Sequence, residues 1–203
     1  MLSSFAASFL LFLIAVSVHE FAHGWAAYRL GDSTARLSGR VTLNPLAHVD
    51  IFWTLILPLV LFISSAGRFI FGAAKPVPVN YWALRNPKRD IMLVGLSGPL
   101  ANFIFALLLS VLIRVIPGIP LLTEGALNLM VINVMLGVFN LIPIPPLDGS
   151  RILIGLLPQP LAERYASIEP YAFIILIILI SFGGLNWIVY PAVEFLLRAL
   201  IYY

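Results

Sequence analysis

Residues 9–24 read FLLFLIAVSVHEFAHG, an apolar run that ends in two histidines and a glutamate. The apolar part has the composition of a helix that spans a membrane. An ionised side chain near the centre of a bilayer costs about 2.5–3.5 kcal/mol on insertion scales, so spanning helices keep such residues for function. We therefore expect this segment to be a membrane helix that carries a polar site.

The whole chain has the composition of an integral membrane protein. Of its 203 residues, 61% are hydrophobic and only 10% are charged, and the mean hydropathy is +1.03. Soluble domains contain about 25% charged residues, so this composition excludes a soluble globular protein. The absence of cysteine excludes disulfides and thiolate metal ligands. No polar stretch is long enough for a separate soluble domain, and we expect one membrane-embedded domain over 1–203.

Five apolar segments approach the roughly 20 residues that a spanning helix needs. They are 2–29, 91–116, 123–142, 170–183 and 185–202. The last two are joined by a glycine pair and predict a C-terminal helical hairpin over 170–203, following a core over about 1–157. A sixth run, 51–66, is shorter and contains a proline. It either crosses the membrane or enters and returns on one side.

The basic residues favour the second alternative for 51–66. Lys and Arg accumulate on the cytoplasmic side of membrane proteins. If 51–66 returns, the basic residues of 30–90 and 143–170 share one face; if it crosses, they divide between the two faces. We therefore expect an all-α polytopic protein with five spans and a re-entrant segment. Its N-terminus should lie outside, and 30–90, 143–170 and the C-terminus should be cytoplasmic.

Two linking segments have the pattern of extended chain. ARLSGRVTLNP (35–45) alternates apolar and polar residues, which is typical of a strand. AKPVPVNYW (74–82) is spaced by prolines, which push the preceding residues out of the helical region. The two segments predict a small β-hairpin on the cytoplasmic side. Alternatively, the strand edge at Val41 is exposed and pairs with an extended substrate.

The polar cluster in the first helix has the spacing of a metal site. Residues four apart share one face of a helix, so His19 and His23 project together with Glu20 beside them. In an H-E-x-x-H helix two imidazoles bind zinc and the glutamate acts as general base. Catalytic zinc usually has three protein ligands, so a third ligand must come from elsewhere. His48 and the carboxylates are the candidates.

Among these candidates Asp148 stands out, in NLIPIPPLDGSRIL (140–153). The prolines hold this stretch extended, and Gly149 permits a sharp turn beside the aspartate. At about 1.5 Å per residue, His19 lies about 27 Å along a helix that starts outside. In the five-span topology Asp148 reaches that same face. The alternative role for Asp148 is the N-cap of a helix over 150–157.

Several motifs together resemble the site-two protease family of intramembrane zinc metalloproteases. They are HEFAH (19–23), SGPLAN (97–102) and FNLIPIPPLDG (139–149). Two further stretches, GDSTARLSGRVTLNPLAHVD (31–50) and AKPVPVN (74–80), are similar to the compact bacterial branch without PDZ or CBS domains. The resemblance implies a location in the bacterial inner (plasma) membrane, and the topology from the basic residues puts the active site toward the cytoplasm.

The resemblance also implies roles for individual residues. One Zn²⁺ per chain would be bound by His19, His23 and Asp148, with Glu20 as the catalytic acid–base. Asn140 and Asn102 would support the reacting carbonyl.

The implied function is that of a zinc metalloendopeptidase that hydrolyses a peptide bond in or near a transmembrane segment. Its partners would be the lipid bilayer and a single-span substrate, such as an anti-sigma factor or a remnant signal peptide, and no nucleic acid.

Two other functions compete with proteolysis, namely a metal-ion transporter and a non-catalytic membrane scaffold. Transporters usually contain internal repeats, and the chain shows no second copy of its polar cluster. Retention of Glu20 beside both histidines argues against a scaffold. A further polar pair, His48 and Asp50, has either a metal or switch role or, as we prefer, a structural one in which His48 bonds to nearby backbone.

Overall fold

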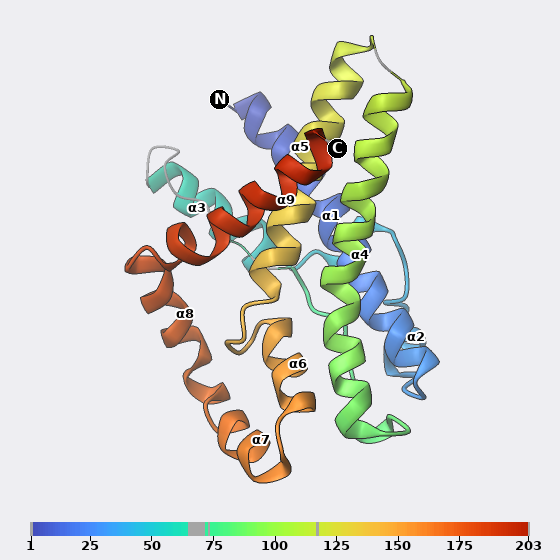
Figure 1. Cartoon of the computed structure of the whole chain (residues 1–203), viewed down its shortest axis with the longest axis vertical. Helices are drawn as coiled ribbons and strands as arrows, with labels where there is room; N and C mark the ends of the chain where they lie inside the picture. Colours follow the sequence, from blue (N-terminus) through green and yellow to red (C-terminus); the bar gives the residue numbers. More distant parts are fainter. Residues whose placement is uncertain (1, 65–71, 73, 117, 203) are drawn as a thin grey trace.

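The computed structural model describes residues 2–64, 72, 74–116 and 118–202, and within these ranges it contains helices and no strand (Figure 1). In this described part, three helices are long and apolar enough to cross a membrane. They are α1 (Leu2–Arg29), α4 (Pro87–Val115) and α5 (Pro120–Asn140). These three confirm the predicted spans 2–29, 91–116 and 123–142.

Shorter helices complete the described chain. The α-helices among them are α2 (Thr34–Leu37), α3 (Leu57–Ser64), α6 (Asp148–Leu156), α7 (Gln159–Ala166), α8 (Ala172–Ser181) and α9 (Tyr190–Tyr202). Single turns of 3₁₀-helix occur at Pro45–His48, Tyr81–Ala83 and Glu169–Tyr171, and π-helical turns at Ile51–Ile56 and Leu185–Val189.

The core lies where α1, α4 and α5 pack together. Ala15 of α1, Ala106 of α4 and Met130 of α5 are fully buried there. Small residues let membrane helices approach closely. At Gly137 of α5 an added Cβ would lie 2.7 Å from the ring of Phe103, so this glycine admits α4. Much of the outer surface of these helices is aliphatic, as a lipid-facing surface requires.

The described residues on the two sides of the segment that follows Asp50 lie close together. Asp50 caps its first turn, because its carboxylate accepts the N–H groups of Phe52 and Trp53. The described helical part, 51–64, is about 21 Å long at 1.5 Å per residue, shorter than a bilayer core. On the return, the Lys75 N–H donates to the His48 carbonyl at 2.9 Å. The two ends of the segment therefore lie together, as a re-entrant segment requires.

The predicted β-hairpin is wrong within the described residues. Residues 34–37 form α2, and Gly39, with φ of +67°, turns the chain after it. Residues 74–80 are extended, but side chains take their N–H groups: Glu20 accepts from Val77 and Asp32 from Asn80. Carboxylates thus replace the strand partner that the alternating pattern predicted, and Val41 has no strand edge to offer a substrate.

The C-terminal segments differ from the predicted hairpin in direction. A turn does form at Gly183, which has φ of +76°. However, α9 does not run back beside α8 but continues away from it, and the last turn of α9 lies at the same end of the molecule as the first turn of α1 (Figure 1). Near that end the Leu200 carbonyl accepts hydrogen bonds from Ser110 and Arg114 of α4. The expectation that the C-terminus shares a face with 30–90 is therefore wrong.

The C-terminal end of α9 lies away from the predicted face because α8 and α9 are both short. With 10 and 13 residues, α8 and α9 are each shorter than the roughly 20 residues of one crossing. Together they traverse the body of the protein once, so the structure does not confirm five separate spans.

Asp32 is expected to hold the extended segment against the helices. It is fully buried, and its carboxylate accepts the N–H and hydroxyl of Thr34 and the N–H of Asn80. Hydrogen bonds to charged groups contribute about 1.5–3 kcal/mol, so Asp32→Ala should lower the free energy of unfolding by about that amount. Hydrogen exchange within 74–80 should also become faster. Ser38→Ala, which removes an exposed hydroxyl, is the control; equal behaviour of the two variants would contradict this role.

Candidate metal centre

Helix α1 brings its two histidines to one point inside the protein. His19 and His23 lie one turn apart, and both are buried, with 5% and 8% of their surface exposed. Their rings meet edge to face, and the two Nε2 atoms are 3.0 Å apart. The i and i+4 spacing therefore places two imidazole nitrogens beside each other, as predicted.

Asp148 completes the cluster from the other half of the chain. Its Oδ2 lies 3.0 Å from Nε2 of His19 and 3.2 Å from Nε2 of His23. Asp148 is the first residue of α6, the capping position is Leu147, and the carboxylate points to the histidines. The alternative that Asp148 serves as an N-cap is thus wrong. Gly149 does not supply a left-handed turn; an added Cβ there would lie 2.3 Å from the Leu141 carbonyl, so close packing requires glycine.

The outer nitrogens of both rings fix where their protons lie. Nδ1 of His19 is 2.6 Å from Oδ1 of Asn102, and Nδ1 of His23 is 2.7 Å from the carbonyl of Val94. Both oxygens are acceptors, so each Nδ1 must carry a proton. In the neutral imidazoles the two Nε2 atoms are then unprotonated, and together with Asp148 they form three acceptors that face one point.

This donor set fits a metal ion. His19, His23 and Asp148 offer ligand atoms that all lie within 4.8 Å of one another. A tetrahedral zinc ion with ligands at about 2.0–2.1 Å needs them about 3.3 Å apart. The observed separations of 3.0–3.2 Å are close to this value. Three acceptors that face one point repel each other unless a cation lies between them, and a metal ion fits that position.

Glycines on α4 make room for the cluster. An added Cβ at Gly98 would lie 2.4 Å from Nε2 of His23 and 2.7 Å from Cε1 of His19. One turn earlier, a Cβ at Gly95 would lie 3.1 Å from the carbonyl of Asp148. Any larger residue at 98 would occupy the space that the imidazoles need. Helix α4 can therefore pack against the site only if residue 98 is glycine.

Glu20 lies next to His19 in sequence and is held by the extended segment. Its Oε2 accepts the N–H of Val77 at 2.8 Å. Val77 is buried, and its side chain packs with Val41 against Gly24 of α1. The segment 74–80 thus fixes the orientation of the carboxylate from outside the three-atom cluster.

The profile of one family matches the chain over residues 7–127 and 122–180, which is most of its length. The chain belongs to Peptidase family M50. This is the family of the site-two proteases, and membership confirms the resemblance of the motifs. With the ligand cluster, it identifies zinc as the metal of the site.

Several relatives in the M50 family carry names that describe zinc metalloproteases. "Putative zinc metalloprotease YwhC" of Bacillus subtilis (strain 168) is 34% identical over 189 residues, which cover 88% of this chain and 82% of that protein. "Putative zinc metalloprotease Rip2" of Mycobacterium tuberculosis is 33% identical over 176 residues, or 86% of this chain and 66% of that protein. "Zinc metalloprotease MJ0392" of Methanocaldococcus jannaschii is 31% identical over 158 residues, or 76% and 35%. No solved structure gives a significant match.

Arg151, one turn after Asp148, holds α6 in place within this M50 fold. Its guanidinium lies 2.5 Å from Oε1 of Glu169 and 5.5 Å from the centre of the Tyr81 ring. Burial alone would lower the pKa of Arg151, but the hydrogen bond to Glu169 and neighbouring acidic groups raise it above its usual value. Arg151 therefore stays charged and anchors the helix that presents Asp148.

Other residues predicted for the site lie apart from the metal ligands. His48 is buried, and its Nε2 bonds to the Thr42 carbonyl at 2.9 Å, which confirms the structural role. Asn140, the last residue of α5, donates from its amide to the Leu136 carbonyl. Asn102 lies behind His19, on the Nδ1 side of the ring, and not where a reacting carbonyl would approach.

Sequence analysis missed three groups that the structure assigns to the site. They are the Val77 N–H, the Val94 carbonyl and Gly98. Two of them are backbone atoms, for which the amino-acid type carries no signal. Gly98 lies within SGPLAN (97–102), so its presence in a motif was visible but its contact with the imidazoles was not.

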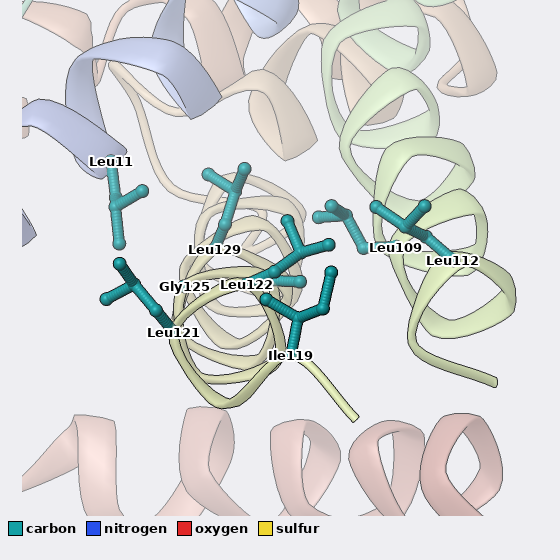
Figure 2. Close-up of a pocket in the computed structure, with 9 residues that line it drawn as sticks. Leu11, Leu109, Leu112, Ile119, Leu121, Leu122, Gly125 and Leu129 are labelled. Carbon is teal, nitrogen blue, oxygen red and sulfur yellow. The ribbon is translucent and has the colours of Figure 1, made fainter. Parts of the chain in front are cut away.

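A large apolar cavity of about 440 Å³ lies away from the metal centre, between α4, α5 and α1 (Figure 2). Its lining is aliphatic apart from one glycine, and on α1 it includes Leu11, two turns before His19. With no polar side chain in its lining, this cavity offers nothing for bond cleavage and suits hydrocarbon.

Gly98→Ala is expected to impair zinc binding, because the new methyl group would displace the imidazoles. Loss of the groups that orient metal-bound histidines typically costs 10–100-fold in metal affinity, and displacement of the rings should cost at least about tenfold. The measurement is zinc affinity of the purified protein by chelator competition. Gly125→Ala is the matched control, since a Cβ there meets no atom within 4 Å. Equal affinities in the two variants would contradict the proposed contact.

Proposed function

We propose that this protein is an intramembrane zinc metalloprotease that hydrolyses a peptide bond in or near a transmembrane segment of a single-span substrate. One observation carries the proposal: two of three convergent acceptors lie on α1, an apolar helix long enough to span a membrane, the third is Asp148 of α6, and Glu20 lies beside them. In an M50 protein this arrangement provides ligands for a metal ion, a general base and an apolar environment that suits a transmembrane substrate.

The residues of the chain divide the chemistry between them. When bound, zinc supplies Lewis acidity, which acidifies a water ligand and polarises a carbonyl. The Glu20 carboxylate takes a proton from the attacking water and delivers it to the amine nitrogen of the leaving peptide. The Val77 N–H, which bonds to Oε2, keeps the carboxylate turned in one direction during both transfers. Asn140 is a candidate donor to the developing oxyanion after rotation of its amide.

Access for water is compatible with this proposal. The side chains of His19 and His23 are only 6% and 11% exposed, whereas that of Asp148 is 17% exposed and Glu20 is partly exposed. The cluster is thus closed behind the imidazoles and more open at the carboxylates. Water would enter from this side, where Glu20 can receive its proton.

The proposal also covers the orientation of the protein in the membrane and the class of its substrate. The basic residues of 30–90 favour a cytoplasmic position for the loops near Asp148, and the bacterial relatives favour the plasma membrane. A spanning helix hides its carbonyls, so a substrate must unwind locally before attack. Substrates of the anti-sigma factor or remnant signal peptide type, with one membrane segment, fit this requirement.

Glu20→Gln separates proteolysis from metal transport and from a scaffold role. The amide cannot accept the proton, so cleavage of a single-span model substrate should fall by at least about 10²-fold. Zinc content should remain at one per chain, because Glu20 lies outside the ligand cluster. The assay compares wild type and variant in the same detergent.

Two outcomes would contradict the proposed function. If Glu20→Gln cleaves as fast as wild type, Glu20 is not the base. If zinc-loaded wild type cleaves no single-span substrate but releases zinc across a liposome membrane, the protein is a transporter.

A further inference from the structure

A second buried asparagine lies behind the metal centre, on α5. Asn133 is fully buried, and so is Asn102 on α4. The Asn102 amide donates to Oδ1 of Asn133 at 2.7 Å, and the Asn133 amide donates to the Leu129 carbonyl at 2.8 Å. Asn133 is thus two hydrogen bonds away from His19, with Asn102 between them.

These hydrogen bonds can run in only one direction. The Leu129 carbonyl is an acceptor, so Asn133 must turn its NH₂ toward it and its Oδ1 toward Asn102. Asn102 must then turn its NH₂ toward Asn133, where it also reaches the Ala15 carbonyl at 3.2 Å. The Oδ1 of Asn102 is left facing His19. The Leu129 carbonyl of α5, acting through Asn133, and the Ala15 carbonyl of α1 together determine which atom of Asn102 meets the imidazole, and the contact to Asn133 is the shorter of the two.

The orientation of the Asn102 amide determines which ring nitrogen of His19 carries the proton. An amide oxygen at 2.6 Å requires a proton on Nδ1, which leaves Nε2 as a lone pair toward Asp148. If the Asn102 amide were reversed, an NH₂ group would face Nδ1 and favour the other tautomer, with a proton on Nε2. That proton would block the metal.

We propose that Asn133 is a positioning residue for the zinc site: it orients Asn102 and thereby keeps Nε2 of His19 free to bind the metal. The role differs from general helix adhesion. Buried asparagines also hold membrane helices together, but that role would act on stability and not specifically on metal affinity. Partners behind metal-bound histidines fix ring orientation and tautomer, and their loss typically costs 10–100-fold in affinity.

The first test is zinc affinity of the full chain in detergent, by chelator competition without substrate. Asn133→Leu keeps the branched shape of the side chain but removes its acceptor, and Asn133→Ala removes it with a smaller side chain. Both should bind zinc about 10–100-fold more weakly. Ser110→Ala, which removes another buried hydrogen bond on α4, should retain wild-type affinity. Wild-type affinity in either folded Asn133 variant would overturn the proposal.

The second test asks whether Asn133 acts through Asn102. In a double-mutant cycle, residues in one network give non-additive effects. If the proposal holds, Asn133→Leu should change zinc affinity less than twofold in the Asn102→Ala background, because the amide that it orients is gone. Losses that multiply would show an independent, structural effect and contradict it.

Although the proposal depends on the zinc site of the proposed function, it does not depend on proteolysis. Zinc affinity is measured without substrate, so a protein that binds zinc but cleaves nothing could still confirm the role of Asn133.

Discussion

Three acceptors converge at one point of an apolar protein body, and the rest of the structure depends on that arrangement. Nε2 of His19, Nε2 of His23 and Oδ2 of Asp148 lie 3.0–3.2 Å apart. Because both Nδ1 atoms give their protons to oxygens behind the rings, the neutral imidazoles present lone pairs at both Nε2 atoms. A buried carboxylate beside two imidazoles needs a compensating cation, and the donor set fits a metal ion in that role.

The surrounding helices supply and orient the three ligand residues. Helix α1 supplies two ligands because residues four apart lie on one face of a helix. Helix α6 brings the third through the close approach of Gly149 to the backbone of Leu141, just after α5. Helix α4 passes beside the imidazoles at Gly98 and orients His19 through Asn102. The extended segment 74–80 adds the N–H that holds Glu20. Elements far apart in the sequence thus meet at one site.

Sequence reasoning was most successful where the geometry is local. The pairing of His19 with His23 follows from the helix repeat alone, and Asp148 stood out by its proline-rich context and its expected face before the family motifs implied it as a ligand. The same reasoning failed for 35–45, because the alternating pattern does not reveal that Asp32 and Glu20 take the N–H groups of the facing segment. It also failed for the C-terminus, since apolar composition does not show whether two short helices fold back or run in series. Asn133 escaped notice because only the direction of its hydrogen bonds gives it a role.

Zinc X-ray absorption of the purified protein tests the central claim most directly. The site described here predicts two imidazole nitrogens at about 2.0–2.1 Å and oxygen ligands at about 2.0–2.2 Å from the metal. The chain contains three histidines, so the number of imidazoles is decisive. A spectrum with two imidazoles would confirm the cluster of His19, His23 and Asp148. One with a third imidazole, which only His48 could supply within one chain, or with oxygen ligands alone, would contradict it.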